Sequence, residues 1–329
     1  MSEKTLVIGT RGSKLALTQS EQIAALLRAA HPGLTVELQI ISTKGDRILD
    51  VALSAVGDKG LFVKEIETAL LAHEVDLAVH SCKDMPSLLP DGLTLAAFPK
   101  RVDPRDALVL PLTHAAPSSD ATGNPLDRLP QGATVGTSSL RRACQLQALR
   151  PDLQLRDVRG NVDTRLRKLD EGQYDAIILA TAGLSRLGLS QRISCPLPPE
   201  VMLPAVAQGT LAIEARSEDP VTLDLLGVLD DPATRVAALT ERAFLRRLEG
   251  GCQVPIAAHA ALDAAQSGML RLSGLVGALD GSVMVRGEKM GDSSDPEGLG
   301  LALAEELLAQ GAADLLAAIR PAAVNEGSA

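Results

Sequence analysis

Short apolar segments alternate with helical segments over much of this 329-residue chain, and this alternation constrains the fold more than any other feature. The opening predicts a strand at 5–9, a helix at 15–30 and a strand at 35–41. From 133 to 180 the alternation predicts three further strands and two helices. Strands that alternate with helices usually pair into a largely parallel sheet with helices on its faces. The sequence therefore predicts an α/β fold with two such lobes.

The rest of the chain completes the domain organisation. A lone strand at 209–216 is expected to return to the first lobe, so that two crossing connections form a hinge. A helix at 232–247, three alternating strands and a long helix at 296–319 then predict a small α+β domain. Three domains are expected: residues 1–103 with 207–228, residues 104–206, and residues 229–329.

The composition excludes several classes of protein. The chain has no Trp, one Tyr and three Phe, so the aromatic platforms on which exposed bases stack are nearly absent. The N-terminus has no secretory signal pattern and no apolar run is long enough to span a bilayer, so we expect a soluble cytoplasmic protein. The four cysteines are far apart and no histidine spacing suggests a metal site, so reduced thiols and no metal are expected.

Positive charge is concentrated in one segment of an otherwise acidic chain. The formal net charge is −9, yet residues 138–168 hold eight basic and three acidic residues. Such a local reversal indicates that an anion binds there.

Two turns between a strand and a helix carry this charge. In the first, Gly136–Arg142, the free N–H groups of a helix start favour an anion, and Arg141 and Arg142 can each grip a carboxylate with two hydrogen bonds. The alternative is a helix cap followed by two solvated arginines. The second turn places Arg159 and Arg165 on either side of the next helix start, so a ligand with several carboxylates is expected.

Two further strand ends in the first lobe carry chemistry. Arg11 and Ser13 follow the first strand and are expected to face the arginines across a cleft. Lys83 and Asp84 follow a short buried strand, where ligands usually bind in α/β sheets. A carboxylate there can stabilise a developing positive charge or transfer a proton, although a plain surface ion pair is the alternative. The glycine-rich segment 42–60 predicts a lid.

The segment Leu248–Pro255 places Cys252 after two glycines, which leave room beside its sulfur. A cysteine in such a turn suits a thiol that carries a group. An inert loop cysteine is the alternative.

Seven segments follow one another along the chain: Thr10–Leu17, Ser42–Asp46, Lys59–Glu65, His80–Pro86, Gly136–Arg142, Arg159–Asn161 and the turn of Cys252. In this order they resemble the porphobilinogen deaminases, also called hydroxymethylbilane synthases, of tetrapyrrole biosynthesis. The resemblance spans nearly the whole chain. It implies two lobes like those of type II periplasmic binding proteins, a third domain, and a dipyrromethane cofactor held by Cys252 through a thioether.

The resemblance also implies the reaction and the roles of residues. Four porphobilinogens would be joined with loss of ammonia, and hydrolysis would release hydroxymethylbilane. Asp84 and Lys83 would be catalytic. Cofactor contacts are implied for Ser13, Lys83, Asp84, Thr137, Ser138, Ser139, Arg141, Arg142, Gly160 and Gln208, and substrate contacts for Arg11, Ser13, Phe62, Arg159, Arg165 and Arg186. Ala207 replaces a glycine that is common in the family. Because alanine adopts fewer backbone conformations than glycine, less flexibility is expected for the hinge beside Gln208.

Two other classes of function remain as alternatives. A two-lobed binding module for a polycarboxylate would explain the arginines and the hinge without catalysis, but not Cys252 or the third domain. A nucleic-acid binder is at odds with the acidic total and the scarce aromatics. The resemblance implies a monomer with porphobilinogen as its small-molecule substrate and with no nucleic-acid or membrane partner.

Overall fold

The structure is a computed structural model that describes residues 5–47, 63–113, 124–248 and 254–319. Most of the expected lid at 42–60, as well as Phe62 and Cys252, therefore lie outside the described residues. The chain divides into two compact units, Met1–Val102 with Gly209–Ala238 and Asp103–Gln208 with Leu239–Ala329. The division into three domains stays a prediction.

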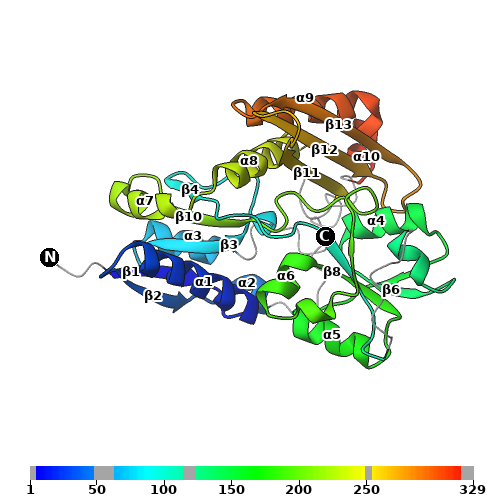
Figure 1. The fold of residues 1–329 in the computed structure, drawn as a ribbon, viewed down its shortest axis with the longest axis horizontal. Coiled ribbons are helices and arrows are strands. Elements are labelled where there is room, and N and C mark those ends of the chain that lie inside the picture. The colour runs from blue at the N-terminus through cyan, green and yellow to red at the C-terminus, as the bar shows by residue number, and fades with distance from the viewer. Residues whose placement is uncertain (1–4, 48–62, 114–123, 249–253, 320–329) are drawn as a thin grey trace, which may run out of the picture. The chain divides into compact units, whose positions relative to one another are not determined.

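The first unit is built on a five-stranded sheet of order β2-β1-β3-β10-β4 (Figure 1). Strands β1, β2 and β3 are parallel, and β10 pairs antiparallel with both β3 and β4. The predicted return of a late strand to the first lobe is thus confirmed. The elements are β1 (Thr5–Thr10), α1 (Lys14–Ala30), β2 (Thr35–Ile40), α2 (Lys44–Arg47), α3 (Lys64–Leu71), β3 (Leu77–Ser81), β4 (Leu93–Ala97), β10 (Leu211–Arg216) and α7 (Pro220–Leu226).

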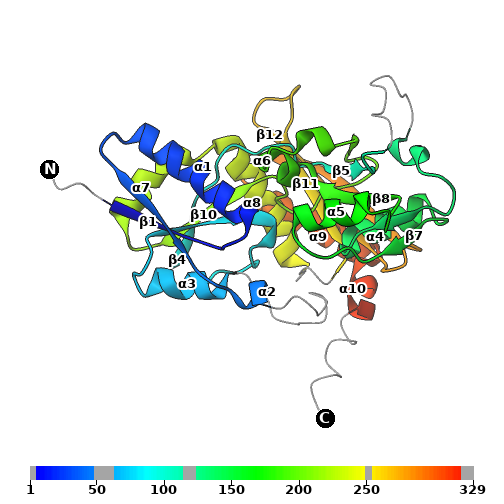
Figure 2. The same ribbon diagram turned by 90° about the horizontal axis from the view of Figure 1, so that it is seen from below.

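Helices cover both faces of this sheet (Figure 2). Because side chains alternate along a strand, Leu6 and Ile8 pack with α1 while Val7 packs with α3 on the other face. Strand β10 is buried at all six positions. The chain therefore needs β10 to close the core of a unit that begins about two hundred residues earlier.

The second unit contains a sheet of the same design, in the order β7-β6-β8-β5-β9. Three strands are parallel, and β5 lies antiparallel between β8 and β9. Its elements are β5 (Asp106–Val109), β6 (Thr134–Gly136), α4 (Leu140–Leu149), β7 (Gln154–Arg156), α5 (Val162–Asp170), β8 (Ala176–Ala180), α6 (Thr181–Arg186) and β9 (Cys195–Leu197). The predicted pair of α/β lobes is confirmed.

A three-stranded antiparallel sheet, β11-β12-β13, forms the C-terminal part of the second unit. The turn before β13 has Gly281 at φ +73°, and Asp280 accepts a hydrogen bond from the backbone N–H of Ser282, as expected for a hairpin. Helix α8 precedes the sheet and α9 packs on β12 and β13. The bounds are α8 (Pro232–Arg247), β11 (Ile256–Leu262), β12 (Met269–Gly277), β13 (Met284–Asp292), α9 (Pro296–Leu307) and α10 (Ala313–Ile319).

The prediction of one unbroken helix at 296–319 is wrong. A π-helical segment, Leu308–Ala312, separates α9 from α10, and Gly311 within it has φ +109°. This conformation lies outside the helical region and is readily adopted only by glycine. The apolar periodicity continues through the break, which is why the pattern alone did not reveal it.

Candidate functional site

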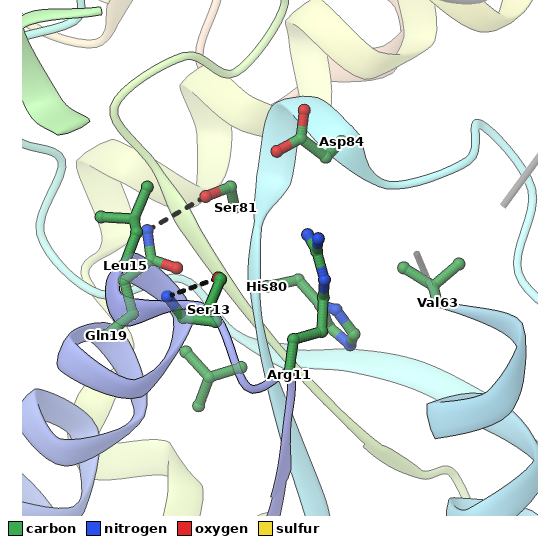
Figure 3. A pocket seen from close by; sticks show the side chains of 10 residues that line it. Arg11, Ser13, Leu15, Gln19, Val63, His80, Ser81 and Asp84 are labelled. Carbon is green, nitrogen blue, oxygen red and sulfur yellow. Dashed lines mark hydrogen bonds between the residues drawn. The ribbon is translucent and has the colours of Figure 1, made fainter. Parts of the chain in front are cut away.

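The first unit holds an open pocket of about 80 Å³ at the carboxyl ends of β1 and β3 (Figure 3). Arg11, Ser13 and Asp84 all line it, together with His80, Ser81 and Gln19. Three of the predicted site residues from two separate segments are therefore brought together. In Figure 3 the Arg11 side chain points into the same space as the Asp84 carboxylate.

The start of α1 shapes one wall of this pocket. Ser13 is the N-cap of the helix, and its hydroxyl accepts a hydrogen bond from the backbone N–H of Ala16 at 3.3 Å. In the second turn of the helix, the side-chain amide nitrogen of Gln19 donates to the hydroxyl of Ser81 at 3.0 Å. The helix start and the end of β3 are thereby fixed to each other.

Lys83 and Asp84 lie in a short 3₁₀ helix, Cys82–Asp84, directly after β3. The backbone N–H of Cys82 donates to the carbonyl of Thr210, and the Cys82 side chain is buried. Buried Cys82 therefore holds the turn in place, while Asp84 is exposed at the pocket. A carboxylate in this position is open to a ligand.

Buried acid–base groups lie behind the pocket. Nε2 of His80 lies 3.0 Å from Oε2 of Glu214, and both side chains are almost fully buried. Burial, followed by the charge of Glu214, raises the pKa of Glu67 on α3, while His80 acts in the opposite direction. His80 is the member of this cluster that lines the pocket, and sequence patterns did not predict the cluster.

In the second unit, Arg141 and Arg142 both bind the carboxylate of Asp106. Nη1 of Arg141 lies 2.7 Å from Oδ2, and Nη2 of Arg142 lies 2.7 Å from Oδ1. The two arginines are 5% and 6% exposed and Asp106 is fully buried. The alternative of two solvated arginines is therefore wrong. Their predicted contacts with ligand carboxylates stay a prediction.

The residues before these arginines form the expected turn from β6 into α4. Ser139 is the N-cap of α4, but its side chain makes no capping bond, and its backbone N–H donates to the Thr137 hydroxyl at 3.2 Å. The Ser138 hydroxyl donates to the carbonyl of Val158 at 3.0 Å. Thr137 and Ser138 thus support the turn, and Thr137 is buried.

The second basic turn leads into α5. Gly160 has φ +107°, and Nε of Arg165 donates to its carbonyl oxygen at 2.8 Å. Arg159 pairs with Asp157 at 3.4 Å.

Arg186, at the end of α6, is half-buried, and burial lowers the pKa of its guanidinium to about 10.

Asp106 was not among the site residues predicted from the sequence. Nε2 of Gln208 donates to Asp106 at 2.9 Å and to the carbonyl of Pro104 at 2.8 Å, so a predicted site residue also contacts this carboxylate. A signal was present: Asp106 opens a strand that continues with Ala-Leu-Val. A single acid on a buried strand needs a cationic partner.

The described cysteines are Cys82, Cys144 and Cys195, and none of them is in a disulfide. The predicted carrier Cys252 lies outside the described residues. Burial raises the pKa of Cys144 to about 11, so its thiolate is scarce at neutral pH.

Among the described residues, no helix is both long and apolar enough to cross a membrane.

Comparison with known proteins agrees with these features. A family model for the dipyrromethane cofactor binding domain of porphobilinogen deaminase matches residues 6–224, and one for the C-terminal domain matches residues 235–309. A porphobilinogen deaminase of Roseiflexus sp. (strain RS-1) is 59% identical over 96% of this chain and 99% of its own length. A porphobilinogen deaminase of Brevibacillus brevis is 55% identical over 95% of this chain and 96% of its own length.

Solved structures match more weakly. The periplasmic aliphatic sulphonate binding protein SsuA from Escherichia coli matches with a TM-score of 0.38 and 15% identity, over 75% of this chain and 71% of its own. The matches to the family models and to the curated relatives each extend over most of the chain. The chain belongs to the porphobilinogen deaminase family.

Proposed function

We propose that this chain is a hydroxymethylbilane synthase whose chemistry takes place at the pocket of the first unit. The observation that carries the proposal is that Arg11, Ser13 and Asp84 line one pocket. The substrate, porphobilinogen, brings an aminomethyl group and two carboxylates. A cation beside an exposed carboxylate suits both parts of such a molecule.

Asp84 is the proposed catalytic group. Loss of ammonia from porphobilinogen leaves a positive charge that spreads onto the pyrrole nitrogen, and a nearby carboxylate stabilises that charge. The acceptor pyrrole then forms the new carbon–carbon bond through its α-carbon and releases a proton, which Asp84 accepts. Lys83, in the same 3₁₀ helix, is proposed to bind a substrate carboxylate.

The residues present fit a cofactor with several carboxylates. Arg141 keeps Nε and Nη2 without an acceptor among the described residues, so these N–H groups are available to an anion. When bound, dipyrromethane supplies the free pyrrole carbon to which the first substrate is joined. Besides Lys83, Asp84 and Arg141, contacts to it are proposed for Cys252 through a thioether, and for Ser13, Thr137, Ser138, Ser139, Arg142, Gly160 and Gln208.

Arginines outside the pocket are proposed to bind the carboxylates of substrate rings. These residues are Arg159, Arg165 and Arg186. Inside the pocket, Arg11 and Ser13 are proposed to contact the substrate as well, and a substrate contact is also proposed for Phe62, which lies outside the described residues. Support for the three arginines of the second unit comes from their grouping after β7 and β8, the parallel strands that flank β6 in the second sheet.

The first experiment is the intact mass of the purified protein beside a Cys252→Ala variant. We expect an excess equal to two linked pyrrole units on the wild type and none on the variant. If the wild type carries no adduct, even after incubation with porphobilinogen, and releases no ammonia, the binding module is the better description.

A second experiment tests the role of Asp84. We expect Asp84→Asn to lower kcat by about 100-fold or more with an unchanged melting temperature, because Asp84 is exposed and its loss removes acid–base catalysis. Asp91→Asn is the matched control, since Asp91 is also exposed but lies outside the pocket. Wild-type turnover in Asp84→Asn would rule out the proposed role.

We also propose that the protein acts as a monomer in the cytoplasm. Light scattering should then give a molar mass near 34.3 kDa, and cell fractionation should recover the protein in the soluble fraction. A mass of twice that value would contradict the first point.

A further inference from the structure

One buried carboxylate in the second unit contacts three of the proposed ligand-binding residues. Asp106 is the first residue of β5 and is fully buried. It accepts hydrogen bonds from Arg141, Arg142 and Gln208. These donors come from the start of α4 and from the connection that precedes β10, so a single side chain links separate segments.

The two guanidinium groups use their donors differently. Arg142 directs Nε and Nη2 to Oδ1 of Asp106, at 3.1 and 2.7 Å, and Nη1 to the carbonyl of Ile178 at 2.9 Å. Arg141 directs Nη1 alone, to Oδ2 of Asp106 and to the carbonyl of Leu203, each at 2.7 Å. All three nitrogens of Arg142 are thus engaged, whereas one edge of Arg141, formed by Nε and Nη2, has no acceptor among the described residues.

The charge balance of the cluster favours binding of a further anion. Burial works against ionisation of Asp106, but the two adjacent guanidinium groups outweigh it and hold the pKa of this carboxyl well below its usual value. Asp106 is therefore ionised at neutral pH. Two arginines and one aspartate leave one net positive charge in a buried place, where it is compensated best by an anion.

We infer that Asp106 is a positioning residue. It holds the guanidinium groups of Arg141 and Arg142 in place, so that Nε and Nη2 of Arg141 face one carboxylate of a pyrrole ligand. This inference rests on the proposed function. A misplaced guanidinium fork loses the parallel geometry on which carboxylate recognition depends. Asp106 thus acts through Arg141 and does not touch the ligand itself.

The test compares Asp106→Asn with the wild-type holoenzyme. The asparagine keeps the size of the side chain but removes its charge and one acceptor for the arginine forks. We expect the fraction of protein with the dipyrromethane mass to fall, and KM for porphobilinogen on the loaded fraction to rise about tenfold, with a smaller change in kcat. Circular dichroism and a melting curve establish that the variant is folded at the assay temperature.

Asp76→Asn is the matched control. Asp76 also pairs with a buried arginine, Arg216, at 3.1 Å, but in the first unit and outside the pocket. An equal loss of cofactor mass and an equal rise in KM in Asp76→Asn would show general destabilisation and overturn the inference. Wild-type occupancy and KM in Asp106→Asn would overturn it too.

A second variant decides the question if Asp106→Asn does not fold. Asp106→Glu keeps the charge but moves the carboxylate by one methylene group. Lower occupancy and a higher KM in a folded Asp106→Glu protein support positioning, and wild-type values overturn it. Failure of the proposed function looks different, because the wild type itself would then carry no adduct and release no ammonia.

Discussion

Ala207 is held in a conformation that alanine rarely adopts. Its φ is +56°, its side chain is fully buried, and its backbone N–H donates to Oε2 of Glu241 at 2.5 Å. The left-handed conformation costs a residue with a Cβ atom about 1–2 kcal/mol. This is the position at which alanine replaces the glycine that is common in the family. The backbone keeps the left-handed conformation there, and the alanine lowers the stability of the folded state.

Ala207→Gly should therefore stabilise the protein. The relief of the left-handed conformation exceeds the entropy that glycine adds to the unfolded chain, which is about 0.4–1 kcal/mol, so we expect a net gain of up to about 1 kcal/mol. Urea unfolding measures it. Ala205→Gly, where φ is not positive, is the control and should destabilise. A loss of stability in Ala207→Gly as large as in the control would contradict the prediction.

Glu67 predicts a dependence of stability on pH. Because its pKa is raised in the folded state, the folded protein favours the protonated form, and ionisation at higher pH lowers the free energy of unfolding. Glu67→Gln should remove this penalty. We expect a gain on the order of 1 kcal/mol at pH 8, which disappears as the pH falls below the unfolded pKa of about 4.3.

Unfolding in urea between pH 4 and pH 8 measures this effect. Glu74→Gln is the control, because Glu74 is exposed just after α3 and should show no such trend. A gain in Glu67→Gln that is constant across the range, or a loss at pH 8, would show that Glu67 is not the source.

Among the elements, α9 approaches α8 unusually closely at a glycine. A Cβ atom at Gly300 would overlap the backbone carbonyl oxygen of Thr240 and lie 2.9 Å from the Cβ atom of Ala243. The first of these neighbours is backbone and cannot rotate away. The two helices therefore pack backbone to backbone, which only glycine allows.

Gly300→Ala should separate these helices and lower the free energy of unfolding by about 1–3 kcal/mol. Gly183→Ala in α6 is the control, since nothing lies within 4 Å of the added methyl group there. The control should be neutral or slightly stabilising because alanine favours helices. Equal melting temperatures for Gly300→Ala and the wild type would contradict the close packing.

The sequence predicted elements better than it predicted the partners of side chains. Helix α8 was predicted with its observed bounds, because apolar periodicity is a local property. The positions of Arg11 and Asp84 at strand ends were predicted from the same local pattern, but the pocket that both residues line was not. The burial of Arg141 and Arg142 was not predicted either, because it depends on Asp106, which lies thirty-five residues earlier in the chain.

At the scale of the whole molecule, the two crossing connections make the first unit discontinuous in sequence. The backbone N–H of Val102 donates to the carbonyl of Gly209 at 3.3 Å, so the chain leaves this unit and returns to it at neighbouring points. Everything between these residues belongs to the second unit.

A shortened protein tests this organisation. Residues 1–102 joined to residues 209–238 by a short glycine and serine linker should fold, because the linker restores β10 between β3 and β4. Cooperative thermal unfolding measured by circular dichroism is the expected result. Residues 1–102 alone lack the buried strand and should not unfold cooperatively. Equal behaviour of the two fragments would show that β10 is dispensable.

The late arrival of β10 also governs the order in which the protein can be completed during synthesis. A ribosome that has made the first hundred residues has made all strands of the first sheet except β10, but β3 and β4 cannot be joined until residues 211–216 emerge. By then the whole five-stranded sheet of the second unit has left the exit tunnel. The part of the chain that is made first is therefore finished after the second sheet can form, and it exposes unpaired strand edges to chaperones in the interval.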